Sequence, residues 1–254
     1  MRPASRAPVV TVSGVGKRFG DVVALDDVSF TLEAPGLLGI LGPNGAGKST
    51  LLDILEGLAA PTTGTVELFG QPIDPYPRAR VGVVLQKEVQ LERCSTEEYA
   101  DLFASIFGVR HGKELILKRA NLGARARVPM VQLSGGEAAR LFIATSLIHD
   151  PELLFLDEPT AALDPKSKRE VGDMLREIAR ERAVVLTTHD LREADALCDR
   201  LVFLVGGRIH AAGTRAELIA AVPEQARGTI GVEDAFFHFC SVRMQRGDVI
   251  EADS

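Results

Sequence analysis

The sequence predicts an α/β fold built on a mostly parallel β-sheet. Short apolar runs bounded by glycine alternate with stretches that repeat apolar residues at helical spacing, which is typical of parallel strands joined by crossover helices. Composition agrees, because the 254 residues are 46% apolar and 25% charged, as in ordinary soluble globular proteins. A chain of this length forms one large domain, or a core domain with a smaller inserted or appended piece.

The first buried strand is expected at residues 37–41, where an apolar run leads directly into a glycine-rich turn. After the turn, apolar residues repeat at helical spacing and predict a helix: Leu51, Leu52, Ile54, Leu55 and Leu58. A second apolar strand at 81–85 ends at Gln86. The pattern beyond it is mainly helical, starting with a helix over 97–107, and we interpret residues 87–132 as an inserted helical subdomain.

The alternation of strand and helix resumes after this segment. The expected elements are helices over 137–148 and 166–182, strands over 153–156 and 184–187, and a helix ending at Leu197. A hairpin follows, with strands at 201–205 and 208–211 about a Gly206-Gly207 turn. Thr214 with Glu217 three residues later predicts a capping box for a short helix, and residues 232–240 predict another helix.

Charge, cysteine and hydropathy patterns argue against several classes of protein. Lys and Arg number 29 against 35 Asp and Glu, a net charge of −6 with no long basic run, which argues against nucleic-acid binding through phosphates. Cys94, Cys198 and Cys240 are odd in number and widely spaced, which favours reduced, packed thiols over a disulfide framework or a zinc site. Apolar runs fall short of the ~18 residues of a spanning helix, and the N-terminus lacks the apolar core of a secretory signal. We therefore expect an intracellular protein that binds no nucleic acid.

The strongest chemical motif is the string GPNGAGKST, which matches G-x-x-x-x-G-K-[ST]. Glycines let successive backbone N–H groups face one concavity, and the N-terminus of the following helix adds positive potential, so the segment holds a polyphosphate. Lys48 is expected at the β and γ phosphates, where an ion pair at 4 Å is worth about 4 kcal/mol before desolvation. The Ser49 hydroxyl is expected to reach a magnesium ion. The predicted phosphate-binding residues are Gly42, Pro43, Asn44, Gly45, Ala46, Gly47, Lys48, Ser49 and Thr50.

Two carboxylates follow a buried strand in the string LLFLDEP. Asp157 and Glu158 emerge at the C-terminal end of the strand, which in such sheets lies beside the phosphate-binding loop. We expect Asp157 to hold magnesium and Glu158 to polarise the water that attacks the γ-phosphate. The pair alone is a weak signal, because a charge pair at a helix N-terminus explains it equally well. Together with the phosphate-binding loop it becomes a strong one.

The string LSGGE at 133–137 has two interpretations. Ser134 as the N-cap and Glu137 at the third helical position form a capping box. Gly135 and Gly136 also expose backbone N–H groups at a helix N-terminus, which is an anion site. One chain hardly needs two such sites for the same phosphate, so the second is expected to serve the nucleotide of another subunit.

In this order, the phosphate loop, LSGGE, LLFLDEP, ALD and a histidine after a strand resemble the ATP-binding cassette (ABC) ATPases over nearly the whole chain. The resemblance implies a P-loop NTPase cassette fold with an N-terminal antiparallel β part, comprising a core of residues 1–86 and 133–254 and the helical subdomain 87–132. One ABC transporter domain would span about 9–240. ATP and magnesium are the implied ligands. Two cassettes would sandwich two ATP molecules, each held by the phosphate loop of one subunit and the LSGG segment of the other. A homodimer is expected because both half-sites are present, and a mixed pair stays open.

The resemblance also assigns roles to residues whose own signal is weak. Phe19 corresponds to the aromatic residue that stacks on adenine, and Gln86 to the glutamine that contacts magnesium and the attacking water. His189 corresponds to the switch histidine near the γ-phosphate, and residues 162–164 to the loop by which two cassettes communicate. Taken singly, Phe19, Gln86 and His189 are more simply explained as a core phenylalanine, a strand-end amide and a helix cap.

The sequence departs from the family pattern in the signature segment. Glu137 stands where glutamine is more frequent, and Ala139 where a polar residue often precedes the arginine matched by Arg140. A carboxylate at 137 weakens the closed dimer if it points toward the γ-phosphate, whereas a capping box turns it toward its own backbone. The segment 108–133 is also shorter than the helical subdomain of many relatives.

The predicted function is that of the ATP-binding and ATP-hydrolysing subunit of an ABC transporter, in which ATP-driven dimerisation of two cassettes drives a separate membrane permease. Such a subunit is cytoplasmic and peripheral on the inner face of the cell membrane. The stretch at 228–239 resembles an ending common among exporter cassettes of the drug, antibiotic and polysaccharide type, which favours export. One alternative is a non-transport ABC ATPase of the assembly-factor type. Another, a nucleotide-binding scaffold without turnover, is disfavoured by intact Glu158 and His189.

Overall fold

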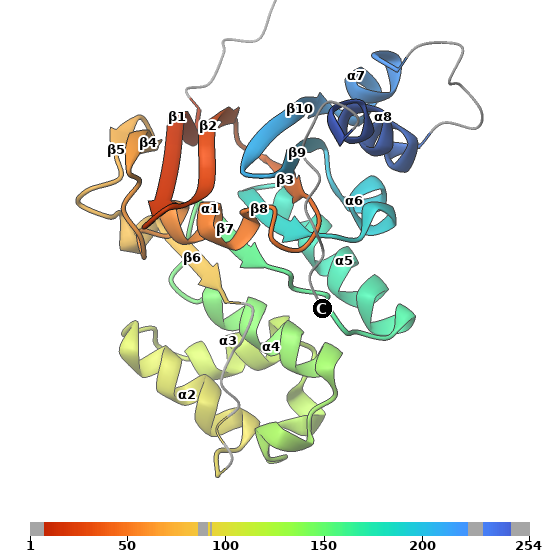
Figure 1. Cartoon of the computed structure of the whole chain (residues 1–254). Coiled ribbons are helices and arrows are strands. Elements are labelled where there is room, and N and C mark those ends of the chain that lie inside the picture. Colours follow the sequence, from red (N-terminus) through yellow and green to blue (C-terminus); the bar gives the residue numbers. More distant parts are fainter. Residues whose placement is uncertain (1–7, 86–90, 92, 223–230, 245–254) are drawn as a thin grey trace, which may run out of the picture.

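The computed structural model describes residues 8–85, 91, 93–222 and 231–244, and it contains two β-sheets (Figure 1). The smaller, antiparallel sheet has the order β2-β1-β4-β5 and consists of Val10–Phe19 (β1), Val22–Leu32 (β2), Thr63–Leu68 (β4) and Gln71–Pro72 (β5). The larger sheet has the order β10-β9-β3-β8-β7-β6. Its strands are Gly36–Leu41 (β3), Val81–Val84 (β6), Leu153–Asp157 (β7), Ala183–Thr188 (β8), Arg200–Val205 (β9) and Arg208–Thr214 (β10). The predicted α/β class, with a mostly parallel sheet and an N-terminal antiparallel part, is confirmed.

The register of the parallel strands fixes where the functional loops lie. β8 pairs in parallel with both β3 and β7, so that Leu41 lies opposite Thr188 and Asp157 opposite Thr187. The strands therefore end at the same edge of the sheet. The residues that follow them along the chain, from Gly42, Glu158 and His189 onward, are brought to one place.

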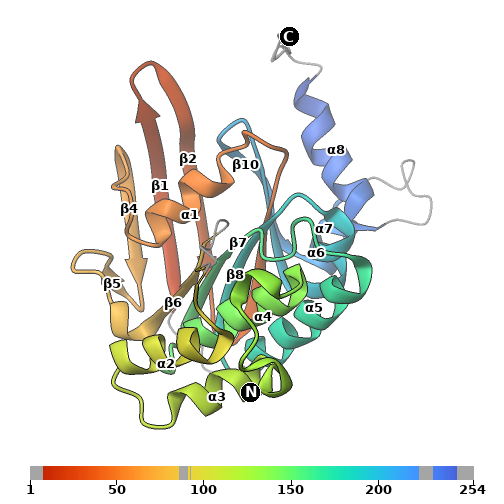
Figure 2. The same ribbon diagram turned by 90° about the horizontal axis from the view of Figure 1, so that it is seen from below.

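Helix α1 (Lys48–Leu55) lies between the two sheets (Figure 2). Its apolar side chains share one buried cluster with residues of β1, β2 and β4 and with one face of the larger sheet. Leu51, Ile54 and Leu55 are fully buried there. The helix is short, but it is enclosed by apolar side chains on several sides, so the loop before it is held on a rigid base.

A second buried cluster joins the opposite face of the larger sheet to the remaining helices (Figure 1). These are Thr96–Ile106 (α2), Gly112–Arg119 (α3), Gly135–Ser146 (α4), Pro165–Ala179 (α5), Leu191–Leu197 (α6), Arg215–Ala220 (α7) and Val232–Met244 (α8). No described helix is both long and apolar enough to cross a membrane. All three cysteines are free; Cys198 and Cys240 are buried in this core and Cys94 is half-buried.

The helix boundaries differ from the sequence expectations by one to four residues, the largest difference being at α8, which ends at Met244 rather than 240. α4 begins at Gly135 rather than 137, because Ser134 is its N-cap, and it ends at Ser146 rather than 148. α5 ends at Ala179 rather than 182, because β8 begins at Ala183. The mainly helical interpretation of 97–132 was too broad, since beyond α3 the chain forms turns and two short 3₁₀ segments. The capping boxes at Ser134 and Thr214 are confirmed. The division into core and helical subdomain stays a prediction.

Candidate nucleotide-binding site

The predicted phosphate-binding segment, residues 42–50, runs from the end of β3 into the first turn of α1. Three features of its backbone require glycine. A Cβ at Gly42 would lie 2.1 Å from the carbonyl oxygen of Leu204, and one at Gly47 would lie 2.7 Å from that of Ala24. Gly47 and Gly45 also have φ angles of 99° and 77°, which residues other than glycine rarely adopt. The glycines are therefore fixed by close packing and by chain direction.

The loop presents backbone donors that the described part of the chain leaves without acceptors. Gly47 stands at the N-cap of α1 and supplies no side-chain cap, so the first turn of α1 keeps its N–H groups open. Among described residues, no acceptor meets the N–H groups of Gly45, Gly47, Lys48 or Ser49. Free N–H groups around a helix N-terminus fit a phosphate, so the loop has the donors that ATP would need.

Gly207, in the turn between β9 and β10, ties this loop to β2. Its N–H donates to Ala46 O at 3.0 Å, and its carbonyl accepts from Asp26 N at 2.8 Å. A Cβ at Gly207 would lie 2.6 Å from Ala24 O. From the sequence, this glycine is recognisable only as part of a hairpin turn, because residue 46, which it contacts, is far away along the chain.

Lys48, the one charged residue of the loop, is buried, with 6% of its side chain exposed. Its ammonium group donates to the carbonyls of Gly42 at 2.9 Å and Pro43 at 3.2 Å. It also lies 3.4 Å from Oε1 of Glu158. These contacts hold the ammonium group at the edge of the sheet where the two carboxylates emerge.

Asp157 and Glu158 are held by a residue that the sequence analysis did not single out. The hydroxyl of Thr187, on the neighbouring strand β8, donates to Asp157 Oδ1 at 2.5 Å and accepts from the N–H of Glu158 at 3.0 Å. Thr187 is fully buried. Glu158 has a φ of 47°, and its bond to Thr187 fixes this uncommon turn. In the sequence, the one sign of this role of Thr187 is that it is a polar residue near the end of an apolar strand.

The carboxylate of Glu158 connects the loop to His189. While Oε1 faces Lys48, Oε2 lies 3.2 Å from Nδ1 of His189. The Glu158 side chain is 11% exposed and the histidine side chain is 54% exposed. The site therefore places a cation, a carboxylate and an imidazole in one row that runs from the buried loop to solvent, which is an arrangement suited to phosphoryl transfer to water.

The magnesium ligands predicted from sequence are an oxygen donor set that suits this cation. Ser49 is exposed at the start of α1, and Asp157 lies at the end of β7. Partial burial and the charge of Asp157 raise the pKa of Asp53, one turn along α1, so a bound cation would relieve negative potential here. No cluster of three or more His, Cys, Asp or Glu side chains is preformed in the described residues. Gln86 lies outside the described residues.

Phe19 is the last residue of β1, and 54% of its surface is exposed. The ammonium group of Lys17 lies 5.0 Å from the centre of its ring, and Lys17 also donates to Ala60 O at 2.7 Å. In the β1–β2 ladder Lys17 is paired with Leu25, whose side chain borders Gly47. An exposed aromatic ring is able to stack on a base.

The signature segment caps α4, which packs on α3, α5 and β6. Oε2 of Glu137 accepts from Ser134 N at 2.9 Å, and Oε1 lies 3.2 Å from Nε of Arg125. The carboxylate is thus turned toward its own helix and Arg125, as the capping box predicted. Ser134 and Gly135 are exposed, and no hydrogen bond or ion pair in the described chain joins them to the phosphate loop.

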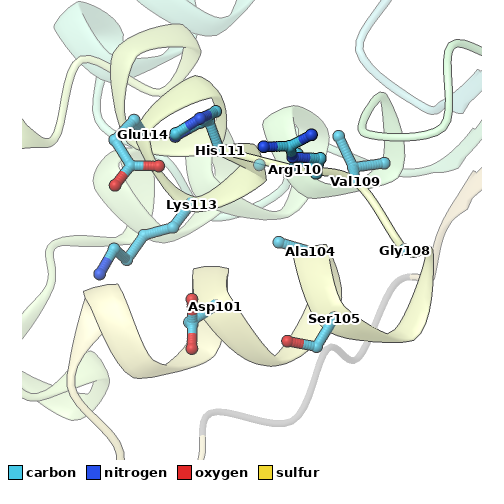
Figure 3. Close-up of a pocket in the computed structure, with 10 residues that line it drawn as sticks. Asp101, Ala104, Ser105, Gly108, Val109, Arg110, His111, Lys113 and Glu114 are labelled. Carbon is cyan, nitrogen blue, oxygen red and sulfur yellow. The ribbon is translucent and has the colours of Figure 1, made fainter.

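A separate cavity of about 320 Å³ lies between α2 and the start of α3 (Figure 3). Its lining includes Asp101, Arg110, His111 and Lys113, and it shares no residue with the predicted site. These side chains are mostly exposed and of both charges, so we assign no ligand to this cavity.

The fold is that of a phosphate-loop cassette, and comparison with known proteins agrees. The family model described as "ABC transporter" matches residues 25–161, more than half of the chain. The chain therefore belongs to the ABC transporter family, as its ATP-binding cassette.

Two curated relatives are export or resistance proteins. The chain is 41% identical to a Nod factor export ATP-binding protein of Sinorhizobium fredii over 78% of its own length and 61% of the relative's. It is 39% identical to a daunorubicin resistance ATP-binding protein of Streptomyces coeruleorubidus over 83% of its own length and 70% of the relative's. The chain thus spans less than two thirds of the Sinorhizobium protein. It also resembles a solved dimeric ATP-binding cassette bound to ADP and Pi in a post-hydrolysis state, with TM-score 0.71 and 28% identity, covering 81% of this chain and 98% of that one.

Proposed function

We propose that this protein is the ATP-hydrolysing subunit of an ABC exporter, acting as a pair of cassettes on a separate membrane permease. The observation that carries the proposal is the meeting of Lys48, Glu158 and His189 at the ends of β3, β7 and β8. Each has a distinct role in phosphoryl transfer to water, and the parallel register of the strands brings them together.

The arrangement suggests how binding prepares hydrolysis. The γ-phosphate of ATP takes the place of the Glu158 carboxylate beside Lys48, because both anions compete for one buried ammonium group. Glu158 is then free to accept a proton from the attacking water, and His189 stays within reach of the same carboxylate and of the γ-phosphate. Thr187 keeps the backbone of Glu158 in place throughout.

Ser49, Asp157 and Gln86 would hold magnesium. The bound cation supplies charge neutralisation on the phosphates. The protein's own residues would fix the position of the cation, since the buried hydroxyl of Thr187 orients Asp157.

A second cassette completes the site in this proposal. The exposed Ser134 and Gly135 open the N-terminus of α4 to an anion, and no bond in the described chain brings them to the chain's own phosphate loop. They would therefore serve the nucleotide of a partner, which we propose is a second copy of this chain. The likeness to a dimeric cassette supports this pairing.

Export is supported by the names of both curated relatives and by the exporter-like segment 228–239. That segment lies partly outside the described residues. The relatives are export or resistance proteins, so their similarity favours transport over the assembly-factor alternative. Coupling to a permease would place the protein at the cytoplasmic face of the membrane. Its cargo would be selected by the permease.

The proposal is tested by purifying the tagged chain from its native membranes in mild detergent, with and without ATP and vanadate, and measuring phosphate release. We expect magnesium-dependent ATP hydrolysis and a stoichiometric multi-span membrane protein in the same fraction. A soluble assembly partner with intact ATPase activity would support the assembly-factor function instead. Absence of hydrolysis with ATP bound would favour a nucleotide-binding scaffold.

A further inference from the structure

Glu193 lies in the first turn of α6, four residues after His189, and its carboxylate joins two loops of the site. One oxygen accepts a hydrogen bond from the hydroxyl of Thr160, and the other accepts from the hydroxyl of Thr188 at 2.8 Å. Both threonines are buried, with 2% and 4% of their surfaces exposed. A single side chain therefore links the turn after Glu158 to the end of β8.

The Thr160 end of this link belongs to a tight turn that begins at Glu158. Ala161 N donates to Glu158 O at 3.1 Å, and Leu163 N donates to Thr160 O at 3.2 Å. Ala162 adopts a positive φ of 62° within the turn. Holding Thr160 consequently restrains the backbone that carries Glu158.

The Thr188 end holds the backbone on both sides of His189. The Thr188 hydroxyl donates to Glu193 and accepts from the N–H of Asp190 at 3.0 Å. Asp190 is in turn bound to Lys168 on α5 at 2.7 Å. The His189 ring is half-exposed and its one ion pair in the described chain is with Glu158, so its position depends on this restrained backbone.

A cap for α6 would be the simplest role for an acidic residue in a first helical turn. Here Asp190 already caps α6, by accepting from the N–H groups of Arg192 and Glu193. The Glu193 carboxylate turns instead to two buried threonines on other elements. We infer that Glu193 is a positioning residue that sets His189 against Glu158 for hydrolysis, an inference that rests on the proposed function.

The kinetic test compares Glu193→Gln with the wild type and with Glu177→Gln, an exposed glutamate on α5, as a matched control. We expect kcat for ATP to fall about 10- to 100-fold in Glu193→Gln, because small displacements of reacting groups cost this much, with KM within twofold. The control should keep its kcat. In a His189→Ala background, Glu193→Gln should reduce kcat by less than twofold further. An unchanged kcat, or the same loss in both backgrounds, would overturn the inference.

A second measurement needs no turnover. The chain has five histidines, and the His189 imidazole resonances can be assigned by their absence from the His189→Ala spectrum. We expect Glu193→Gln and Thr188→Val to shift these resonances and leave those of the other histidines in place. Unshifted His189 resonances would overturn the inference even if the protein hydrolyses ATP. A protein that shows the shifts but no hydrolysis would contradict the proposed function alone.

Discussion

The carboxylate of Glu158 lies 3.4 Å from the ammonium group of Lys48, so the residue expected to activate water is also the partner of the residue expected to hold the γ-phosphate. Both side chains are largely buried, which makes the pair stronger than a surface ion pair and costly to break on one side only. In the proposed function, the γ-phosphate of ATP would replace the Glu158 carboxylate beside Lys48. This exchange would link binding of the nucleotide to release of Glu158.

Phe19 is expected to carry the base. Phe19→Ala should raise the dissociation constant for ATP about 5- to 100-fold, because stacking of one base on an aromatic ring is worth about 1–3 kcal/mol. Phe237→Ala on α8 is the matched control, since both side chains are 54% exposed. Fluorescent ATP titration gives both affinities. Equal affinities of the two variants would remove Phe19 from the site.

Glu137 is expected to stabilise α4 without opposing the ATP-driven closure of two cassettes. The hydrogen bond from the backbone of Ser134 is the largest cause of its lowered pKa in the folded protein. The carboxylate therefore stabilises the fold at pH values above its pKa in the unfolded chain, and this stabilisation is lost as pH falls through its lower pKa in the folded protein. Glu137→Ala should cost about 1 kcal/mol of unfolding free energy at pH 7, measured in urea. Glu137→Gln should change ATP turnover by less than about twofold. A tenfold rise in turnover would show that the carboxylate opposes closure.

Gly207 is expected to be essential to the shape of the phosphate loop. Gly207→Ala should cost at least about 2 kcal/mol, because the added Cβ meets the backbone of Ala24 and φ is 74°. Gly206→Ala is the control, with φ of 55° but open space around its Cβ, and should cost about 1 kcal/mol. ATP affinity should fall only in Gly207→Ala. Thermal unfolding with and without ATP distinguishes the two, and equal losses would contradict this role.

Glu56, at the end of α1, is expected to make stability depend on pH. Burial, followed by the charges of Asp53 and Asp157, raises its pKa to about 8, and its Oε1 is buried without a hydrogen-bond partner. Between about pH 4.5 and 8, the Glu56 carboxyl keeps its proton in the folded protein but has lost it in the unfolded chain. The free energy of unfolding therefore falls as pH rises through this range.

Glu56→Gln should remove this pH dependence. At pH 8 its free energy of unfolding should be at least about 1 kcal/mol higher than that of the wild type. Glu67→Gln, on an exposed position of β4, is the control and should follow the wild type. Urea unfolding at pH 5, 6, 7 and 8 gives the four free energies for each protein. Parallel pH profiles for all three proteins would show that Glu56 does not titrate in this range.

The sequence could predict those parts of the site that are encoded by adjacent residues. The phosphate loop and the capping boxes at Ser134 and Thr214 are local, because the residues that bond to one another lie within a few positions. The six strands of the larger sheet followed from apolar runs and turn residues, although α4 and α5 differ by up to three residues at their ends. The strands of the antiparallel sheet were implied only by the family resemblance. Two orientations were open for the signature glutamate, and the structure has the one of the capping box, in which the carboxylate faces its own backbone.

Other parts depended on contacts between distant residues. Thr187 reaches Asp157 across 30 positions, and Glu193 reaches Thr160 across 33. Neither contact leaves a local pattern, because strand pairing and helix packing decide which residues meet. Gly207 was visible as a turn residue, but its bond to the phosphate loop was not.

The most direct test of the account is a comparison of ATP affinity and turnover in the wild type and Glu158→Gln. The account predicts that Glu158→Gln binds ATP at least as tightly, because a neutral amide competes less for Lys48, while turnover falls about 100-fold or more. Lys48→Ala should instead lose affinity. Wild-type turnover in Glu158→Gln, or weaker binding of ATP by it, would contradict the proposed exchange at Lys48 and the role of Glu158 in hydrolysis.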